Sequence, residues 1–120
     1  MNKDAIEDNE MLYRAVRKSY PDGFKNGKAT PALFLDPDGA SVDRDGERDE
    51  SVIIDILKNR FKNYNTAVKI QAGTCREIGT YPIPKPTKNK YHAEIHESET
   101  EVEISLLKAT QLALSCVNVK

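Results

Sequence analysis

The chain has 120 residues, enough for one domain whose hydrophobic core needs neither disulfides nor metals for support. Its 18 Lys and Arg residues nearly balance its 19 Asp and Glu residues, and the formal net charge is −1. General nucleic-acid binding is therefore not favoured, because excess positive charge supplies most of that affinity, although a local basic patch is compatible with a neutral total.

The sequence gives no sign of a membrane segment or an export signal. No run approaches the roughly 20 apolar residues of a membrane span, and the stretch MNKDAIEDNE is acidic, without the apolar core of a signal peptide. Cys75 and Cys116 form no CxxC motif, which favours two reduced thiols in a cytoplasmic protein, with a disulfide between them as the alternative. For Cys75 we favour a buried thiol over a thiolate activated by Arg76.

Residues 1–9 are polar and acidic, and we expect a flexible lead-in to a single domain that spans residues 10–120. Residues 11–16 allow a strand or a helical turn. We favour a strand, because turn-forming PDG and NGK sequences follow soon afterward. Arg14 in this segment resembles the NAD-holding arginine early on the first strand of ADP-ribosyltransferase-type folds. No recognisable catalytic glutamate motif completes that resemblance, and the alternative is a surface or salt-bridging arginine.

Residues 32–43, ALFLDPDGASVD, predict a hairpin. An apolar run at 33–35 leads into Asp-Pro-Asp-Gly at 36–39, a strong turn sequence, because proline presets one backbone angle and glycine tolerates positive φ. Residues 40–42 would then form the returning strand.

The acidic string DRDGERDE at 43–50 invites comparison with a calcium loop. Counted from Asp43, its glycine falls at the fourth position, whereas an EF-hand loop needs glycine at the sixth. Arg44 and Arg48 would also compete for the carboxylates. We interpret the string as a solvated loop that leads into a helix.

Residues 50–64 predict that helix, with Asp49 or Ser51 available to cap its start. A core-facing stripe repeats at three- and four-residue steps: Val52, Ile53, Ile56, Leu57, Arg60 and Phe61. Residues 66–73 then predict a strand, because they include β-branched Val68 and Ile70.

One helical turn after residue 74 precedes three prolines at alternate positions, Pro82, Pro84 and Pro86. Alternating proline favours an extended strip that cannot donate hydrogen bonds within a central ladder. The segment is therefore predicted to be an edge strand or connector, and a docking segment for another protein is the functional alternative.

Residues 91–96, YHAEIH, hold both histidines and alternate apolar with polar side chains, as a half-buried strand does. His92, Glu94 and His96 would share one face. We expect either a solvated strand face or an acid–base pair of His92 with Glu94, because histidine titrates near neutrality and a carboxylate tunes it.

Two metal motifs compete for this stretch, and neither is complete. His92 and Glu94 match the H-x-E half of the zinc deaminase signature, but no P-C-x-x-C follows. A helical H-E-x-x-H motif would need the glutamate one place earlier. A strand separates the backbones of His92 and His96 by about 13 Å, which strains both rings on one ion. We therefore expect no metal site and no cofactor.

The C-terminal part predicts a second main helix, over about residues 100–117. Ser98 with Glu101, or Thr100 with Glu103, would form a capping box at its start. Its stripe comprises Val102, Leu106, Ala109, Leu112, Ala113 and Cys116.

Three short motifs together resemble a loose group of small bacterial proteins. They are L-Y-R at residues 12–14, Phe34 followed by S-V-D at 41–43, and N-x-x-H-A-x-I at 89–95. The resemblance spans most of the chain and implies a bacterial cytoplasmic setting but no particular activity. It makes Arg14, Asp43 and His92 the first residues to test.

These observations predict a single small α+β domain with a short mixed or antiparallel sheet and two main helices. The leading functional hypothesis is a non-catalytic interaction or accessory protein in a multigene system. Its partner would be another protein or a second copy of the chain, with no membrane partner. The alternative is a small enzyme that acts on a nucleotide or nucleic acid, with Arg14, Asp43, His92 and Glu94 in one cleft.

Overall fold

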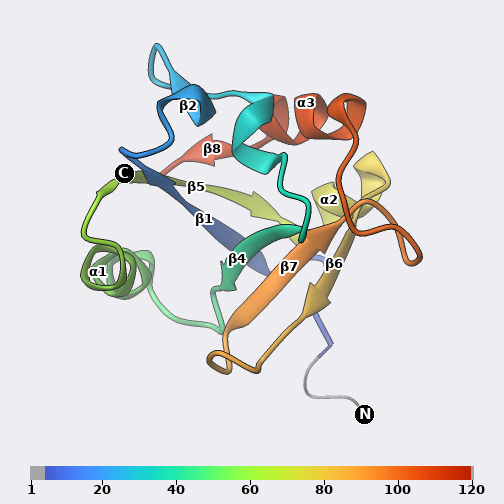
Figure 1. Ribbon diagram of the computed structural model, residues 1–120. Helices are drawn as coiled ribbons and strands as arrows, with labels where there is room; N and C mark the ends of the chain where they lie inside the picture. Colours follow the sequence, from blue (N-terminus) through green and yellow to red (C-terminus); the bar gives the residue numbers. More distant parts are fainter. Residues whose placement is uncertain (1–4, 120) are drawn as a thin grey trace.

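A six-stranded antiparallel sheet forms the centre of the molecule, in the strand order β6-β7-β4-β1-β5-β8 (Figure 1). The computed structural model describes residues 5–119. The strands are β1 (Met11–Arg17), β4 (Ala40–Arg44), β5 (Tyr64–Gln71), β6 (Tyr81–Pro84), β7 (His92–His96) and β8 (Val117–Asn118), with β2 (Phe24–Lys25) and β3 (Lys28–Ala29) as a separate pair. The helices are α1 (Glu50–Arg60), α2 (Ala72–Ile78) and α3 (Leu106–Ser115), and two 3-10 turns are η1 (Pro21–Gly23) and η2 (Pro31–Phe34). The predicted α+β class is confirmed.

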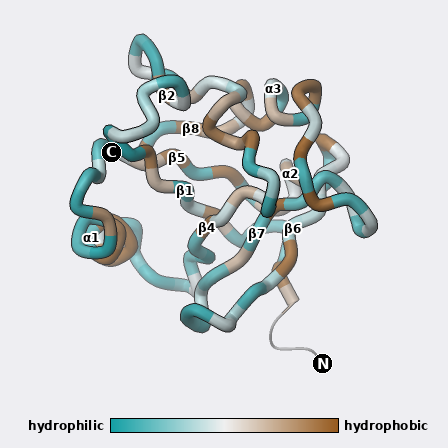
Figure 2. Tube along the Cα trace, in the orientation of Figure 1, coloured by the Kyte–Doolittle hydropathy of each residue, from teal (hydrophilic) through white to brown (hydrophobic). Residues whose placement is uncertain are grey.

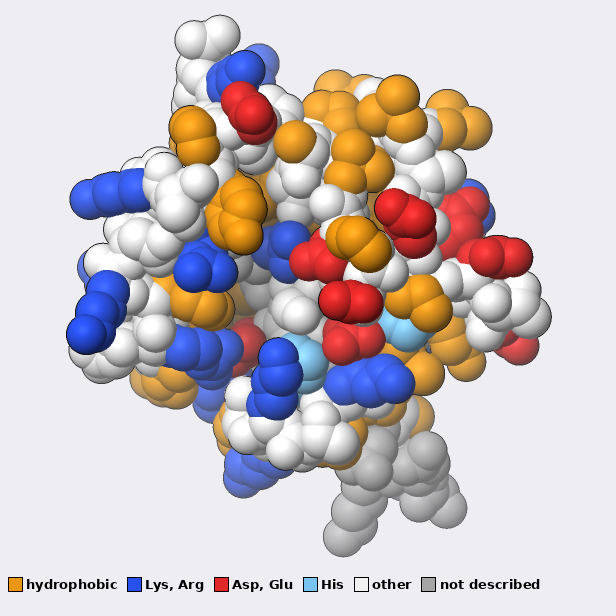
Figure 3. Space-filling view, viewed as in Figure 1, with side chains coloured by type: hydrophobic (Ala, Val, Ile, Leu, Met, Phe, Trp, Pro, Cys, Tyr) orange, Lys and Arg blue, Asp and Glu red, His pale blue; other side chains and the backbone are white. Residues whose placement is uncertain are grey.

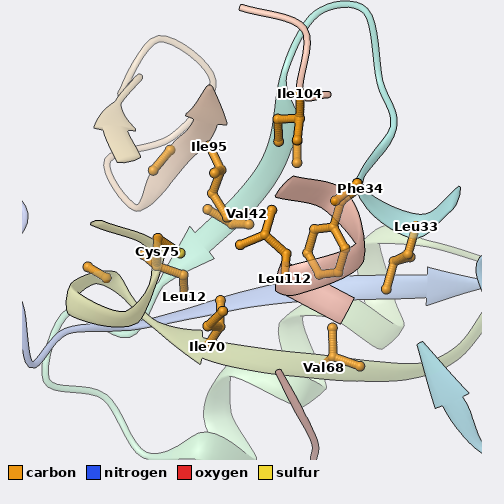
Figure 4. Packing of buried hydrophobic residues seen from close by; sticks show 14 of the residues in the cluster. Leu12, Leu33, Phe34, Val42, Val68, Ile70, Cys75, Ile95, Ile104 and Leu112 are labelled. Atoms are coloured by element: carbon orange, nitrogen blue, oxygen red, sulfur yellow. The ribbon is translucent and has the colours of Figure 1, made fainter. Parts of the chain in front are cut away.

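Helices cover both faces of the sheet. On one face α1 encloses a small cluster: Tyr13, Ile53, Ile54, Leu57 and Ala67. Figure 2 shows the hydrophobic side of α1 turned toward the strands. On the other face, α2, α3 and η2 enclose a larger core that includes Leu12, Phe34, Val42, Val68, Ile70, Ile95, Ile104 and Leu112 (Figure 4). Successive strand residues alternate between these clusters, as the pleat requires.

The predicted strand at the YHAEIH stretch is confirmed as β7. Ala93 and Ile95 are fully buried in the larger core, and the polar residues point to the other face. The expectation of a solvated face is wrong for His92, which is 5% exposed. His92 lies opposite the buried Asp43 on β4, and Nδ1 of its ring lies 3.0 Å from the Lys85 carbonyl, which removes the side chain from solvent.

The predicted hairpin at residues 32–43 is half wrong. Residues 31–34 form η2, which buries Leu33 and Phe34, and the strand β4 pairs with β1 and β7 instead. The turn itself is formed: the Gly39 N–H donates to the Asp36 carbonyl at 3.0 Å, and Gly39 has a φ of +89°. Burial of the apolar run under α3 therefore outweighs its strand propensity.

The first predicted helix is confirmed, but it ends at Arg60 and not at residue 64, because Tyr64 already pairs with Arg17 in the sheet. Its stripe is also rotated, since Ile54 is buried and Val52 is 45% exposed. The single helical turn expected after residue 74 is the seven-residue α2, which ends at Gly79 with a φ of +100°.

The second main helix begins at Leu106, later than predicted. Ser98 and Glu101 form an isolated turn, in which the Ser98 hydroxyl accepts from the Glu101 N–H at 3.1 Å. Ser105 is the actual N-cap and accepts from the Lys108 N–H at 3.3 Å.

The proline-rich segment supplies β6, at one edge of the sheet, and the predicted edge strand is confirmed. Residues 1–4 of the expected lead-in lie outside the described residues. Nearer the domain, Ile6 is buried in the larger core and Asp8 forms an ion pair with Arg76 at 2.6 Å.

Candidate functional site

The two central strands β1 and β4 separate after a very short ladder. Their register contains two pairs, Leu12 with Arg44 and Tyr13 with Asp43. The next two pairs of that register, Arg14 with Val42 and Ala15 with Ser41, are not formed, and Figure 1 shows β4 curving away from β1. The Ser41 carbonyl instead accepts a hydrogen bond from Nη1 of Arg14 at 2.8 Å. An arginine side chain therefore replaces a main-chain contact between the strands.

This separation opens a cleft of about 680 Å³ that reaches both faces of the sheet. Arg14 belongs to the same face as Leu12 and Val16, whereas Asp43 and His92 belong to the face covered by α1. All three nevertheless line the cleft, because it passes through the gap between the strands. Figure 3 shows the resulting hollow in the molecular surface.

The lining of the cleft is mixed in charge and partly aromatic. Among the described residues it includes basic Arg14, Arg17, Arg60 and Lys88, acidic Asp22, Asp36 and Asp43, and aromatic Tyr13, Tyr20 and Phe61. Lys and Arg side chains gather on the α1 side of the hollow, and Asp and Glu side chains gather on the opposite side (Figure 3).

Arg14 is a half-buried cation in this cleft. Its Nε donates to the Leu33 carbonyl at 2.7 Å and its Nη1 to the Ser41 carbonyl, which holds the guanidinium between η2 and β4. Burial lowers the pKa of Arg14, and the nearby charge of Asp36 opposes that shift. Within residues 5–119 no carboxylate forms an ion pair with Arg14, and its Nη2 has no hydrogen-bond partner. Nη2 is therefore available to an acceptor on a ligand.

The sequence predicted that Asp43 belongs to a solvated loop, and this prediction is wrong. Asp43 is a buried residue of β4. Its two carboxylate oxygens accept from Nη1 and Nη2 of Arg60 at 2.8 and 3.0 Å. This hydrogen bonding raises the pKa of Arg60. The acidic string thus begins with a strand residue that is neutralised by α1, and the loop starts only after Arg44.

His92 lies directly opposite Asp43 on the neighbouring strand. The Arg44 N–H donates to the Tyr91 carbonyl at 2.8 Å, which makes the adjacent Asp43–His92 pair the non-hydrogen-bonded type, in which side chains are closest. Nδ1 of His92 lies 3.0 Å from the Lys85 carbonyl. Because a carbonyl only accepts, Nδ1 carries the proton and Nε2 of the neutral ring is a base.

Nε2 of His92 is accessible from the cleft. It has no hydrogen-bond partner within residues 5–119, yet no side-chain nitrogen or oxygen there is both buried and unpartnered. Nε2 therefore reaches solvent, and the cleft is the hollow that His92 lines. The geometry gives the ring a fixed tautomer and a free basic nitrogen, the two requirements for proton transfer to or from a bound ligand.

Glu94 does not line the cleft with the other three candidates. Its Oε1 lies 2.8 Å from Nε2 of His96, so the structure pairs it with the second histidine and not with His92. The pairing follows from the strand, in which residues two apart share a face, and from the Lys85 carbonyl, which already binds His92. No group of three or more His, Cys, Asp and Glu side chains within residues 5–119 is arranged to hold a metal ion.

The cysteines are both free thiols. Burial raises the pKa of Cys75 to about 12 and that of Cys116 to about 11. The charge of Arg76 favours the Cys75 thiolate but is outweighed by desolvation, so the buried thiol that the sequence favoured is the one present.

Sequence reasoning missed the other side of the cleft: Arg17, Tyr20, Arg60, Phe61 and Lys88. Arg60 and Phe61 were assigned to the core-facing stripe of a helix, where both would serve packing alone. The available signal was the sequence RFK at 60–62, in which basic and aromatic residues alternate, and RKSY at 17–20, in which an aromatic residue closely follows two basic ones.

No protein-family model, curated protein or solved structure matches this chain. Within residues 5–119, no helix is both long enough and apolar enough to cross a membrane.

Proposed function

We propose that the cleft between β1 and β4 binds a nucleotide and that the protein is a small enzyme in which His92 transfers a proton at the bound ligand. The observation that carries this proposal is the convergence of Arg14 and His92, from β1 and β7, on one cleft, each with an unpartnered nitrogen. Catalytic groups must reach one substrate, and a shared cleft meets that condition.

The chemistry of the lining supports a nucleotide over other anions. Nη2 of Arg14 offers a charged donor to a phosphate oxygen, the type of contact for which arginine is best suited. Tyr20 and Phe61 offer ring faces to a base, and the Asp36 carboxylate is an acceptor for ribose hydroxyls. A cleft of about 680 Å³ falls in the usual range for small-ligand sites, ~300–1,000 Å³.

The residue roles follow from the contacts. Arg14 would orient the phosphate, and Nε2 of neutral His92 would accept a proton from a ligand hydroxyl or a water molecule. Asp43 would act on His92 as a positioning residue: it lies directly opposite His92 in the register and is itself held by Arg60.

The experiment is a binding and turnover assay with a panel of nucleoside mono-, di- and triphosphates. We expect Arg14→Gln to weaken binding by about tenfold or more, because a charged hydrogen bond contributes ~1.5–3 kcal/mol. Arg76→Gln, which alters an arginine outside the cleft, is the matched control. We expect His92→Gln to abolish turnover but keep binding, whereas His96→Gln, at the other histidine, leaves turnover unchanged.

Failure of every nucleotide to bind, or turnover that survives His92→Gln, would overturn the proposal. Folding of each variant is checked by circular dichroism and thermal melting, so that loss of the domain is not read as loss of the site.

The accessory-protein hypothesis has one observation in its favour, the exposed leucines of α3. Leu106, Leu107 and Leu114 are 64%, 70% and 81% exposed, and large exposed apolar side chains in one region are typical of interaction surfaces. This surface does not specify the chemistry of a partner, whereas the cleft specifies that of its ligand. The cleft therefore carries the proposal, and a protein partner remains a prediction.

A further inference from the structure

The mouth of the cleft on the α1 side is a cluster of cations. Asn63 joins two of its segments, because the Lys18 N–H donates to the Asn63 carbonyl at 2.7 Å and Nε of Arg17 donates to Asn63 Oδ1 at 3.2 Å. Arg60 and Lys62 are the near neighbours of Asn63 in the chain. Four basic residues therefore lie on two adjoining segments, the end of β1 and the end of α1, and two of them, Arg17 and Arg60, line the cleft, in a chain whose total charge is −1.

Most of this charge is not neutralised. Arg60 is paired with Asp43, but within residues 5–119 no ion pair is formed by Arg17, Lys18 or Lys62. Lys18 and Lys62 are exposed. A group in which three of four cations have no carboxylate partner attracts a polyanion, through release of its condensed counterions.

Aromatic rings are interleaved with these cations. The guanidinium carbon of Arg17 lies 5.7 Å from the centre of the Tyr20 ring and 5.0 Å from that of Phe61. Tyr20 is 65% exposed, an uncommon position for a large ring unless its face has a use. Cations that follow a phosphate backbone, alternating with rings on which bases stack, are the two components of single-strand binding surfaces.

The opposite side of the hollow carries the reverse charge. Asp36 and Asp38 lie on the turn before β4, and farther from the cleft an acidic run includes Glu97, which is paired with Lys108, and Glu99, Glu101 and Glu103. Figure 3 shows acidic side chains on this side and basic ones on the α1 side. This difference in charge favours a path for a phosphate backbone over the α1 side of the hollow.

We propose that the ligand of the cleft is the terminal nucleotide of a single-stranded nucleic acid. The adjoining nucleotides lie on the basic–aromatic surface formed by Arg17, Lys18, Tyr20, Arg60, Phe61 and Lys62. This inference rests on the proposed function, because the same cleft receives the terminal nucleotide. The local patch overrides the neutral total charge that argued against nucleic acid in general.

The test measures binding of fluorescein-labelled single strands of about 12 nucleotides, a length within the usual span of such sites, to the full chain by fluorescence anisotropy. Parallel measurements with an oligoribonucleotide and an oligodeoxyribonucleotide show whether the protein binds RNA or DNA, which share the same phosphate backbone chemistry. We expect single strands to bind more tightly than a nucleoside monophosphate or a blunt duplex of the same sequence, and their affinity to fall steeply with added salt.

Charge reversal provides the matched comparison. Lys62→Glu and Lys18→Glu should each weaken single-strand binding about fivefold or more at 0.1 M salt, the effect expected for one lost phosphate contact. Lys28→Glu alters an exposed lysine on β3 and should have no effect. Tyr20→Ala should weaken binding about tenfold through lost stacking, and Tyr81→Ala, on the edge strand β6, is its control.

Single strands that bind no more tightly than the monophosphate, or that respond equally to Lys28→Glu and Lys62→Glu, would overturn this inference. If this inference fails but a nucleoside monophosphate still binds in a way that depends on Arg14, the proposed function is retained. Single-strand binding that depends on Lys62 and is unchanged in Arg14→Gln would also overturn this inference, because the terminal nucleotide then does not occupy the cleft, whereas the proposed function is tested separately by nucleotide binding and turnover.

Discussion

The carboxylate of Asp43 accepts hydrogen bonds from both terminal nitrogens of Arg60, at 2.8 and 3.0 Å, and so joins the centre of the sheet to the last turn of α1. The side chain of Asp43 is 5% exposed and that of Arg60 is 33% exposed. The two partners therefore differ in burial: a nearly buried carboxylate is neutralised by a guanidinium that is partly exposed to water.

Arg60→Ala tests that dependence. Removal of the guanidinium leaves a buried carboxylate without its partner, and we expect the free energy of unfolding to fall by ~1–3 kcal/mol, less than for a fully buried pair because Arg60 is partly solvated. Lys58→Ala, an exposed substitution on the same helix, should change it by less than ~0.5 kcal/mol. Urea denaturation measures both, and equal effects would contradict the assigned contact.

The turn before β4 requires glycine both for its positive φ and for lack of space beside His96, and a comparison with Gly27 separates these two effects. Gly39 has a φ of +89°, and a Cβ there would lie 2.7 Å from Cδ2 of His96. Gly27 has a φ of +76° with no heavy atom within 4 Å of an added Cβ. Gly27→Ala should therefore cost only the backbone term, ~1–2 kcal/mol. Gly39→Ala should cost more in the same thermal or urea measurement, and a smaller cost would show that His96 moves away freely.

Alkaline pH should destabilise the domain through Cys75. Burial raises the pKa of this thiol from 9.0 to about 12, so above pH 9 the unfolded chain loses a proton that the folded state keeps. The free energy of unfolding should fall as pH rises from 9 to about 12, by up to ~1.4 kcal/mol per pH unit from this group. Burial raises the pKa of Tyr13 in the same direction, so Cys75→Ala should reduce the slope without removing it. An unchanged slope would contradict this prediction.

Two leucines on α3 should differ strongly in the effect of truncation on stability. Leu112 is fully buried in the larger core and Leu114 is 81% exposed. Leu112→Ala should lower the free energy of unfolding by ~2–5 kcal/mol, the usual range for a buried leucine. Leu114→Ala should change it by less than ~0.5 kcal/mol. Chemical denaturation measures the free energy of unfolding of both variants. A larger loss for Leu114→Ala than for Leu112→Ala would show that the buried face of α3 is wrongly assigned.

The sequence predicted those elements whose signal is local and periodic. The alternation of residues 91–96 identified β7, and the prolines at 82 and 84 identified an edge strand, because each pattern reports directly on one pleated segment. The start of α3 was misplaced because Ser98 and Glu101 satisfy each other in an isolated turn. Burial of Ile104 then sets the path of the chain before the helix begins at Leu106, and that burial depends on distant strands.

The candidate site was predictable only in part, for a related reason. Arg14, Asp43 and His92 were identified as residues to test, and they do line one cleft. The exclusion of Glu94 and the pairing of Asp43 with Arg60 depend on register and packing between elements far apart in the chain. The separation of β1 from β4 has no local signature at all, since both segments have ordinary strand sequences.

That separation gives the sheet a mechanical property. Within residues 5–119, the paired residues that join the β5–β1 half of the sheet to the β4–β7 half are Leu12–Arg44 and Tyr13–Asp43, and beside them the Asp45 N–H donates to the Met11 carbonyl at 2.9 Å. Beyond them, the spacing of the two halves is maintained by the Arg14 side chain and not by a main-chain ladder. A ligand that contacts Arg14 would therefore touch the same side chain that bridges the two halves of the sheet across the gap.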